Sequence, residues 1–498
     1  MPSILALDQG TTGSTALLIH QDGTVLGRGY RELSQHYPRP GWVEHDPEEI
    51  LRVSLEAMRE AMAASGERPA GIGITNQRET VVLWDRRTLA PVAPAIVWQD
   101  RRTSARCREL REAGVETLLR ARTGLVADPY FSATKLEWLL RDRELRRRAE
   151  RGELAAGTVE SWLVARLTGG RAHVTDHTNA SRTLLYALSA RDWDPELLAV
   201  FGVPRAILPD IVPSAGPVAE TDPAHLAGSL PIAGLAGDQQ AALFGQGCCV
   251  EGLAKNTYGT GAFLLVYTGG RLPTPARGVL ATAACGPRGE PAYALEGSIF
   301  IAGAAVQWLR DGLGLLRVAA ESEELARSVS DTGGVHFVPA FAGLGTPHWE
   351  SEARGTITGI TGGTSRAHLV RATLEAMAFS SAELLTAMAG SGGLDVPALR
   401  VDGGASANDW LMQFQADVLG VPVERPDMVE TTALGAAGLA GIALGVWKGT
   451  GDFLAGRRFQ RFVPAVGEPE RRELRRGWDR AVGAALAWAR PGQRTDGT

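Results

Sequence analysis

The chain has 498 residues, of which 44% are hydrophobic, which is enough to bury large cores and to form at least two domains. Its net charge of -5 lacks the basic excess typical of nucleic-acid and membrane-surface binders, so we expect neither kind of partner. The only lysines are Lys135, Lys255 and Lys448, which excludes a phosphate loop of the Gly-x-x-x-x-Gly-Lys-Ser/Thr type.

Residues 4–19 read as a strand, a tight turn and a returning strand. Gly10 and Gly13 permit backbone angles at which successive N–H groups converge on an anion. Asp8, at the end of the first strand, is placed to hold a cation beside the same anion. Hydroxyl donors follow at Thr11, Thr12 and Ser14. A phosphate loop and an ordinary polar β-hairpin are both compatible with this stretch.

Polar residues follow two of the next predicted strands. After a helix with Asp46 as its cap and Pro47 as its first residue, a short apolar strand at 70–75 leads into Arg78 and Glu79. Side chains at the carboxyl end of a strand bind ligands in many open α/β sheets, although a solvated turn with an Arg–Glu ion pair is the alternative. A further predicted strand, at 95–98, ends with Trp98 and is followed by the polar residues 99–103. Two more aromatic side chains, Tyr130 and Phe131, lie in a later loop.

A third polar strand end lies near the middle of the chain. An apolar strand at 232–236 ends at Gly237, and Asp238 then opens a helical stretch that includes Gln239. The position of Asp238 is typical of an N-cap residue, which stabilises a helix by about 1 kcal/mol. A carboxylate held there is also well placed to act as a general base, and the pattern alone leaves both roles open.

Residues 255–266 repeat the pattern of the first hairpin, with a Gly259-Thr260-Gly261 turn that leads into an apolar strand. Such self-similarity predicts two related halves with a nucleotide between their hairpins. A later strand at 399–402 ends in a Gly403-Gly404 turn, where a flat ring or a ribose can approach the backbone.

Two further features bear on location. An uncharged stretch at 431–447 is shorter than the roughly 20 residues of a membrane span, so we predict a closely packed buried helix. The four cysteines have no metal-ligand spacing, which fits a reducing cytoplasm: Cys107, Cys248, Cys249 and Cys285. We therefore expect a cytoplasmic protein that does not span a membrane.

Taken in order, these blocks resemble the sugar-kinase family with the actin-like ATPase fold, and within it the members that phosphorylate glycerol. The blocks that carry the resemblance lie at residues 6–12, 41–47, 73–80, 128–132, 237–246, 255–261 and 400–405. The resemblance implies an α/β fold of two actin-like (ribonuclease H-like) ATPase domains related by internal duplication, at 1–247 and 248–498. Nucleotide and substrate would lie in the cleft between them.

The resemblance also implies ATP-dependent phosphorylation of glycerol to sn-glycerol 3-phosphate, with Mg²⁺, by a homo-oligomer (a dimer or a tetramer). Asp238 matches the general base. The residues that match glycerol contacts are Arg78, Glu79, Trp98, Tyr130, Asp238, Gln239 and Phe263. Those that match nucleotide contacts are Thr11, Thr12, Gly13, Thr260, Gly303, Gln307, Gly404 and Asn408. Asp8 and Asp238 match the surroundings of the metal.

Three departures from the family pattern stand out. Gly13 and Thr15 replace a serine and an arginine of familiar members, which removes a cationic phosphate contact and predicts unusual nucleotide affinity or metal dependence. Ala262 replaces a frequent cysteine, a change that we expect to be silent. Residues 225–231 lack the arginine with which some bacterial members bind the inhibitor fructose 1,6-bisphosphate, so we expect insensitivity to it.

Two other functions compete with this interpretation. A kinase of the same family that acts on another polyol or a ketose would keep the fold but would need a wider pocket than the Arg78-Glu79 pair and the tyrosine loop suggest. An ATP-gated binding protein, like the chaperones of the same broad fold, would turn over ATP without any acceptor.

Overall fold

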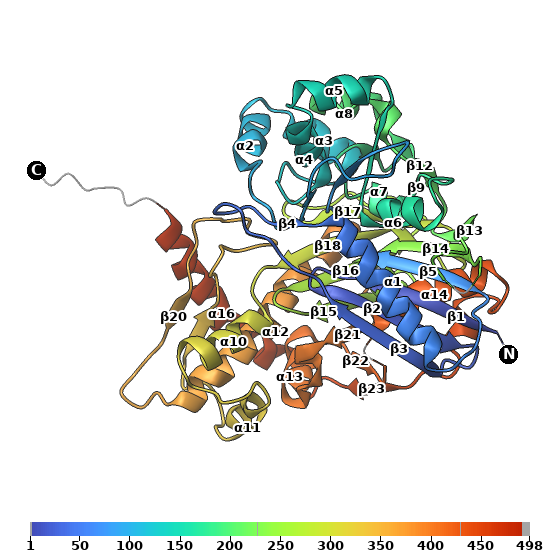
Figure 1. Cartoon of the computed structure of the whole chain (residues 1–498). Helices are drawn as coiled ribbons and strands as arrows, with labels where there is room; N and C mark the ends of the chain where they lie inside the picture. The colour runs from blue at the N-terminus through green and yellow to red at the C-terminus, as the bar shows by residue number, and fades with distance from the viewer. Residues whose placement is uncertain (1, 227, 429, 491–498) are drawn as a thin grey trace, which may run out of the picture.

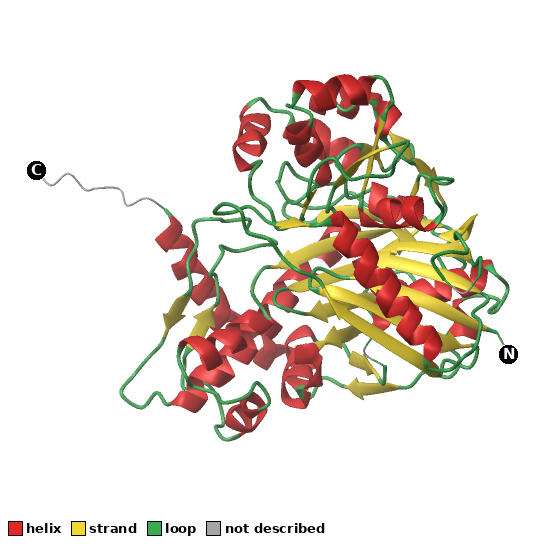
Figure 2. Cartoon of the chain, in the orientation of Figure 1, coloured by secondary structure: helices red, strands yellow, loops and turns green. Residues whose placement is uncertain are grey.

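The computed structural model describes residues 2–226, 228–428 and 430–490. Two β-sheets form the centre of the molecule, with helices on their faces and a largely helical lobe beside the first sheet (Figures 1 and 2). The mixture of sheets and helices confirms the α/β class.

The first sheet has six strands in the order β13-β14-β5-β1-β2-β3. Strand β1 pairs antiparallel with β2 and parallel with β5, so the first predicted hairpin is β1 and β2. The strands are β1 (Ser3–Gln9), β2 (Gly13–His20), β3 (Val25–Glu32), β5 (Gly71–Asn76), β13 (Ala215–Glu220) and β14 (Pro231–Gly237).

The second sheet has seven strands in the order β17-β18-β16-β15-β21-β22-β23. The strands are β15 (Ala254–Tyr258), β16 (Ala262–Gly269), β17 (Leu280–Cys285), β18 (Pro291–Ile299), β21 (Leu399–Gly403), β22 (Val423–Pro426) and β23 (Phe459–Phe462). In both sheets, three antiparallel strands are followed by two parallel ones: β3-β2-β1-β5-β14 corresponds to β18-β16-β15-β21-β22. This shared order confirms the internal duplication that the repeated hairpin predicted.

Helices cover both faces of the first sheet. Helix α1 (Pro47–Ala63), capped by Asp46 as predicted, lies on one face (Figure 1). Helices α9 (Asp238–Gly245) and α14 (Thr431–Ala443) lie on the other, and α14 is the predicted buried helix. A Cβ added to Gly435 would lie 1.8 Å from the carbonyl oxygen of Ala241, so only glycine permits this approach of α14 to α9. A helix from late in the sequence therefore packs on the sheet built by the first half.

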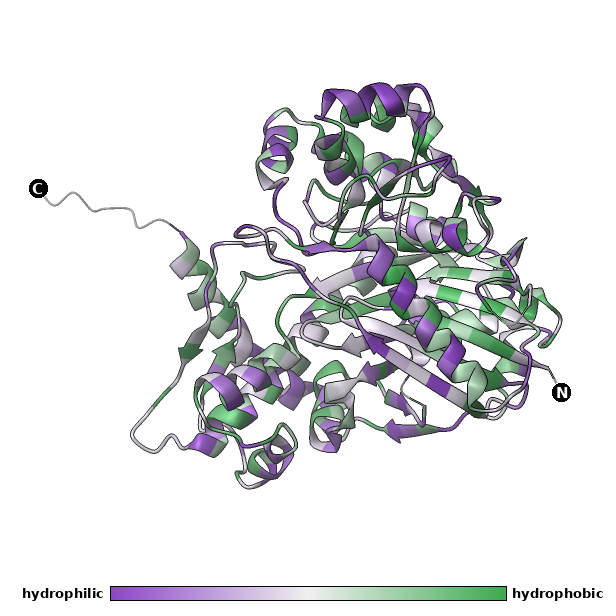
Figure 3. Cartoon of the chain, viewed as in Figure 1, coloured by the Kyte–Doolittle hydropathy of each residue, from purple (hydrophilic) through white to green (hydrophobic). Residues whose placement is uncertain are grey.

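A lobe between β5 and β13 has its own apolar core, to which Leu280 and Tyr293 of the second sheet contribute. Helix α5 is mostly hydrophilic and exposed (Figure 3), as its arginine-rich sequence suggests. Strand β4 (Glu44–His45) precedes β5 but pairs with β7 of this lobe. The strands between β5 and β13 are β6 (Val82–Asp85), β7 (Ala95–Ile96), β8 (Leu154–Gly157), β9 (Val174–Asp176), β10 (Tyr186–Ala187), β11 (Asp192–Trp193) and β12 (Asp210–Val212). The helices are α2 (Ser104–Glu112), α3 (Glu116–Thr123), α4 (Ser132–Leu139), α5 (Arg143–Glu150), α6 (Val159–Leu167), α7 (His177–Ala180) and α8 (Pro195–Phe201).

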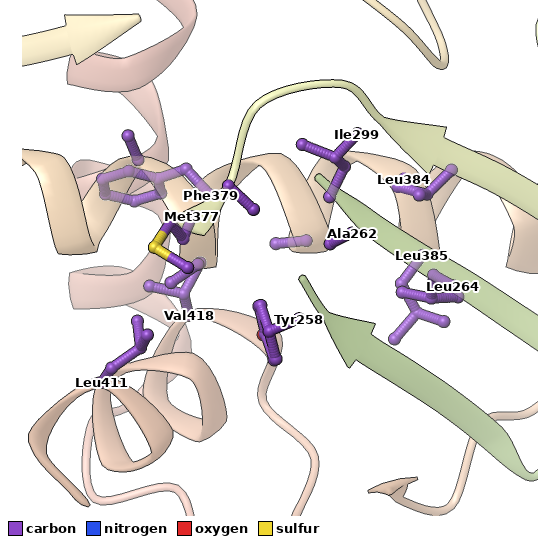
Figure 4. Close-up of a cluster of buried hydrophobic side chains, with 14 of the residues drawn as sticks. Tyr258, Ala262, Leu264, Ile299, Met377, Phe379, Leu384, Leu385, Leu411 and Val418 are labelled. Atoms are coloured by element: carbon purple, nitrogen blue, oxygen red, sulfur yellow. The ribbon is translucent and has the colours of Figure 1, made fainter. Parts of the chain in front are cut away.

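The second sheet packs on the long helix α12 (Arg366–Gly392): Leu264 lies beside Leu384 and Leu385 (Figure 4), and Tyr258 belongs to the same apolar cluster. The remaining α-helices and strands are α10 (Gly303–Gln307), α11 (Glu321–Arg327), β19 (His336–Val338), β20 (Thr356–Thr358), α12 (Arg366–Gly392), α13 (Asp409–Leu419), α15 (Thr450–Phe453) and α16 (Glu468–Ala489). Short 3₁₀ or π turns lie at Arg205–Ile207, Trp308–Gly312 and Gly404–Ala407. Among the described residues, no helix has the length and apolar character needed to cross a membrane.

Candidate active site

The turn that follows β5 is buried. Arg78 and Glu79 are 2% and 1% exposed, so the alternative of a solvated turn is wrong. Glu79 has a φ of 62°, a left-handed conformation that is uncommon for residues other than glycine and is often found at functional sites. The turn therefore holds both charged side chains in the interior, where they need partners.

Those partners are Glu296 in β18 and Arg182 after α7. Arg78 donates from both Nη atoms to Glu296, at 2.7 and 2.9 Å. Arg182 donates to Glu79 Oε1 at 2.7 Å and to Glu296 Oε1 at 2.9 Å. Two buried arginines and two buried glutamates thus balance one another. Burial alone would raise the pKa of Glu296, but Arg182 and Arg78 reverse this effect and lower it to about 2.

Asp238 lies at the open edge of this cluster. It is the first residue of α9, and Gly237 occupies the N-cap, so the N-cap position expected for Asp238 was wrong by one residue. Asp238 Oδ1 accepts a hydrogen bond from the Gln239 amide at 2.7 Å and lies 3.2 Å from Arg78 Nε. Its side chain is 30% exposed, whereas those of Glu79 and Glu296 are buried. Burial raises the pKa of Asp238, and Arg78 and Lys255 oppose the rise.

Three aromatic side chains stand beside the charged cluster. The ring centroid of Trp98 lies 5.6 Å from that of Tyr130 and 6.4 Å from that of Phe263, and both pairs are arranged edge to face. Tyr130 accepts a hydrogen bond from Arg78 Nη2 at 3.2 Å, and Trp98 Nε1 donates to Thr11 Oγ1 at 2.9 Å. This aromatic wall (Trp98, Tyr130 and Phe263) therefore connects the first hairpin with β16 of the second half.

The first hairpin is closed by a bond from the Gly10 amide to the Gly13 carbonyl, at 2.9 Å, with Thr12 exposed at its tip. Asp8 in β1 pairs with Thr15 in the neighbouring strand β2. Burial, with a contribution from the nearby Asp238, raises the pKa of Asp8 to about 7. Among the described residues, no group of three or more His, Cys, Asp or Glu side chains could hold a metal ion. Asp8 and Asp238 nevertheless suit Mg²⁺, which commonly takes one or two carboxylates together with water and substrate phosphates.

The second hairpin repeats this closure, with the Gly259 amide bonded to the Gly261 carbonyl at 2.8 Å and Thr260 exposed. Helix α10 begins against it: the Gly303 amide donates to the Gly259 carbonyl at 3.0 Å. A Cβ on Gly303 would lie 2.6 Å from that carbonyl oxygen, which explains the glycine. Gln307 is exposed at the other end of α10.

The turn after β21 also borders the second hairpin. Gly403 has a φ of 82°, and a Cβ there would lie 2.3 Å from the carbonyl oxygen of Tyr258. Gly404 is exposed, with open space where its side chain would be. Asn408 caps α13 by accepting from the Leu411 amide at 2.8 Å, so its oxygen already has a structural role. Gly303 and the Gly403-Gly404 turn thus flank one hairpin, on either side.

Sequence reasoning missed three members of the site. Glu296 is the one charged residue in a buried strand, a pattern that marks a buried charge, but nothing local identifies its partners. Arg182 follows no recognisable motif. Lys255 stood out as one of only three lysines, yet its contact with Gln239 emerges only from the fold.

Two duplicated sheets, each with a glycine-closed hairpin, and a buried polar cluster between them form the actin-like (ribonuclease H-like) ATPase fold. The N-terminal domain model of the FGGY family of carbohydrate kinases matches residues 3–245, and its C-terminal domain model matches residues 254–444. The chain belongs to the FGGY family of carbohydrate kinases. A domain boundary at 247 and 248 stays a prediction.

Known relatives cover almost the entire chain. It is 56% identical to a glycerol kinase of Alkalilimnicola ehrlichii, with 98% of this chain and 99% of that protein covered. It is 54% identical to a glycerol kinase of Carboxydothermus hydrogenoformans, covering 97% and 98%. The structure matches Plasmodium falciparum glycerol kinase, solved with ADP, at a TM-score of 0.93, 35% identity and 98% coverage of each chain. A xylulose kinase from Lactobacillus acidophilus shares the fold at a TM-score of 0.88, with 19% identity and coverage of 98% and 99%.

Proposed function

We propose that this protein transfers the γ-phosphoryl group of ATP to glycerol and forms sn-glycerol 3-phosphate. The observation that carries the proposal is the cluster of Arg78, Glu79, Tyr130 and Asp238 beside the aromatic wall, between the two hairpins. Relatives named glycerol kinase at 54% and 56% identity over nearly the full length support the choice of acceptor.

Glycerol is uncharged, so its recognition depends on hydrogen bonds to its hydroxyl groups and on packing against its carbon chain. Glu79 Oε1 is engaged by Arg182, while Glu79 Oε2 has no hydrogen-bond donor among the described residues and can accept from a hydroxyl. Trp98 and Phe263 offer apolar faces to the C–H surface. An acceptor that lacked the matching hydroxyls would leave these buried polar groups unpaired, which gives specificity.

Asp238 then takes the proton of the attacking hydroxyl. Its side chain is 30% exposed, so a bound hydroxyl can reach it, and its raised pKa makes it a better base than an ordinary aspartate. A positioned general base typically contributes a factor of about 10² to 10⁴ in rate. The amide groups of the two hairpins, with Thr11, Thr12 and Thr260, hold the nucleotide phosphates, and the Gly303–Gln307 and Gly404–Asn408 segments border the rest of the nucleotide.

Asp8 and Asp238 are the residues that would hold Mg²⁺. When bound, the ion supplies positive charge that offsets the charge of the phosphates. Thr15 is uncharged, whereas an arginine at this position would add positive charge beside the phosphates. The charge of Mg²⁺ therefore matters more in this protein than in family members that have the arginine. We therefore expect a steep dependence of turnover on Mg²⁺ concentration, measured at fixed ATP.

We also propose a cytoplasmic homo-oligomer, a dimer or a tetramer, that is insensitive to fructose 1,6-bisphosphate. In the segment 225–231, Ala227 lies outside the described residues. Arg59 donates to the carbonyl of His225 at 2.8 Å, and Arg68 donates to that of Ser229 at 2.8 Å. These guanidinium groups are therefore engaged with the backbone, and strong inhibition at physiological bisphosphate concentrations would contradict the proposal.

The direct test is ADP release from Mg-ATP by the purified protein with glycerol, with pentoses, with gluconate and with no acceptor. Stimulation by glycerol alone is expected. Stimulation by another sugar would keep the family and discard the acceptor. The chaperone-like alternative is disfavoured because the family consists of carbohydrate kinases, and it would require turnover that is independent of any acceptor.

A further inference from the structure

Lysine is rare in this chain, and its use is selective. Arginine and lysine together number 51, of which three are lysines. Lys448 is exposed, whereas Lys135 and Lys255 are both fully buried. Lys135 donates to the carbonyls of Tyr130 and Phe131, at 2.6 and 3.1 Å, beneath the tyrosine loop. Both buried lysines thus lie next to residues of the candidate active site.

Lys255 connects the two halves of the molecule. It extends from β15, the strand that leads into the second hairpin, and its Nζ donates to Gln239 Oε1 in α9 and to Thr257 Oγ1, the latter at 2.8 Å. Gln239 directly follows Asp238. The ammonium group of Lys255, on the strand that leads into the second hairpin, therefore holds the side chain of Gln239, which belongs to the proposed acceptor site.

An ammonium group also decides which way the Gln239 amide faces. Lysine only donates hydrogen bonds, so it can meet the amide oxygen and never the NH₂ group. Gln239 Oε1 consequently points to Lys255, and Nε2 faces away from it. Among the residues that the structure describes, Gln239 Nε2 has no hydrogen-bond acceptor. Two donor hydrogens are left free beside Asp238.

Three nearby carboxylates favour the charged form of Lys255, whereas its burial opposes that form. Burial lowers the pKa of Lys255 to about 8, against the attraction of Asp402, Asp238 and Glu296, while Arg78 lowers it further. A compact ammonium makes these contacts where the wide fork of an arginine would need more room and more acceptors.

We infer that Lys255 is a positioning residue that fixes the Gln239 amide so that its NH₂ group donates to a hydroxyl oxygen of the acceptor. This inference rests on the proposed function. It predicts that Lys255 acts on acceptor binding through Gln239, and not on ATP binding, although Lys255 lies on the hairpin strand.

A double-mutant cycle tests the inference, with kcat and KM measured for glycerol and for ATP. Lys255→Met and Gln239→Leu should each raise the KM for glycerol by about tenfold and leave the KM for ATP unchanged. The double variant should be no worse than either single variant, because both remove the same interaction. Lys135→Met is the matched control: this equally buried lysine acts through a different loop, so its effect should multiply with that of Gln239→Leu.

Multiplying effects of Lys255→Met and Gln239→Leu, or a raised KM for ATP in Lys255→Met, would overturn the inference. If Lys255→Met fails to fold, Gln239→Glu serves instead. It keeps an oxygen for Lys255 and replaces the donating NH₂ group with a carboxylate oxygen, which cannot donate and adds a negative charge. An unchanged KM for glycerol in that variant would also overturn the inference. A wild-type protein without glycerol-dependent turnover would instead overturn the proposed function, and the inference with it.

Discussion

Arg78 and Glu296, 218 positions apart in the sequence, form a buried bidentate ion pair with N–O distances of 2.7 and 2.9 Å. Arg78 belongs to the turn after β5 in the first sheet, and Glu296 belongs to β18 in the second. The pair therefore ties the two halves together directly beneath Asp238, and it orients the guanidinium group that borders the proposed acceptor site.

Glu296→Gln should destabilise the protein strongly. The neutral amide would leave the charges of Arg78 and Arg182 without their shared carboxylate in the interior, and such a loss typically costs about 3–5 kcal/mol. Urea unfolding at neutral pH measures the effect. Asp311→Asn, which breaks the exposed Arg310–Asp311 pair, is the matched control and should leave stability unchanged. Equal stability of the two variants would show that the buried pair contributes nothing.

The contribution of Glu296 should depend on pH. Its pKa is lowered from 4.5 to about 2 in the folded protein, so the folded state binds this proton less readily than the unfolded chain does. The stabilisation is therefore complete above pH 4.5 and is lost as the pH falls from 4.5 towards 2. The difference in unfolding free energy between wild type and Glu296→Gln should shrink over that window. A difference that stays constant down to pH 3 would contradict the low pKa.

Asp238→Asn should bind glycerol but turn over about 10² to 10⁴ times more slowly than the wild type. The asparagine keeps the shape of the side chain and its place at the start of α9, but it cannot take up the proton of the hydroxyl. Calorimetric titration with glycerol, beside steady-state rates, separates binding from chemistry. A nearly unchanged kcat would remove Asp238 from the role of base.

Gly13→Ala should destabilise the first hairpin by about 1–3 kcal/mol. A Cβ at Gly13 would lie 2.5 Å from the carbonyl oxygen of Arg31 and 2.8 Å from the hydroxyl of Tyr30, so β3 would have to move. This contact gives a structural reason for the absence of the family's serine. Gly216→Ala, at a position with open space around its Cβ, is the control and should be nearly neutral. Thermal unfolding of both variants suffices, and a Gly13→Ala protein as stable as the wild type would refute the predicted clash.

The sequence predicted those parts of the fold that rest on short-range signals. The two hairpins, the Asp46 cap and the buried helix that begins at Thr431 were predicted because glycines, capping residues and apolar runs act on their neighbours; the helix ends at Ala443, four residues before the predicted end. The start of α9 was misplaced by one residue, because a glycine and an aspartate side by side can both serve as an N-cap.

The site was predicted only in part, for a different reason. Arg78 and Glu79 were identified from their place after a strand and from family resemblance, but the pattern could not say whether they are buried. Their partners Arg182 and Glu296 lie more than 100 positions away, and only the packing of the two sheets and the lobe against one another brings them together. A single sequence contains no periodic pattern from which ion pairs between distant residues could be predicted.

The central claim is that glycerol receives the phosphoryl group of ATP, and identification of the product tests it most directly. Phosphorus NMR of a reaction with ATP, Mg²⁺ and glycerol should show one new phosphomonoester, sn-glycerol 3-phosphate, that grows in step with ADP. Growth of ADP and inorganic phosphate without a phosphomonoester, at the same rate whether or not glycerol is present, would contradict the account.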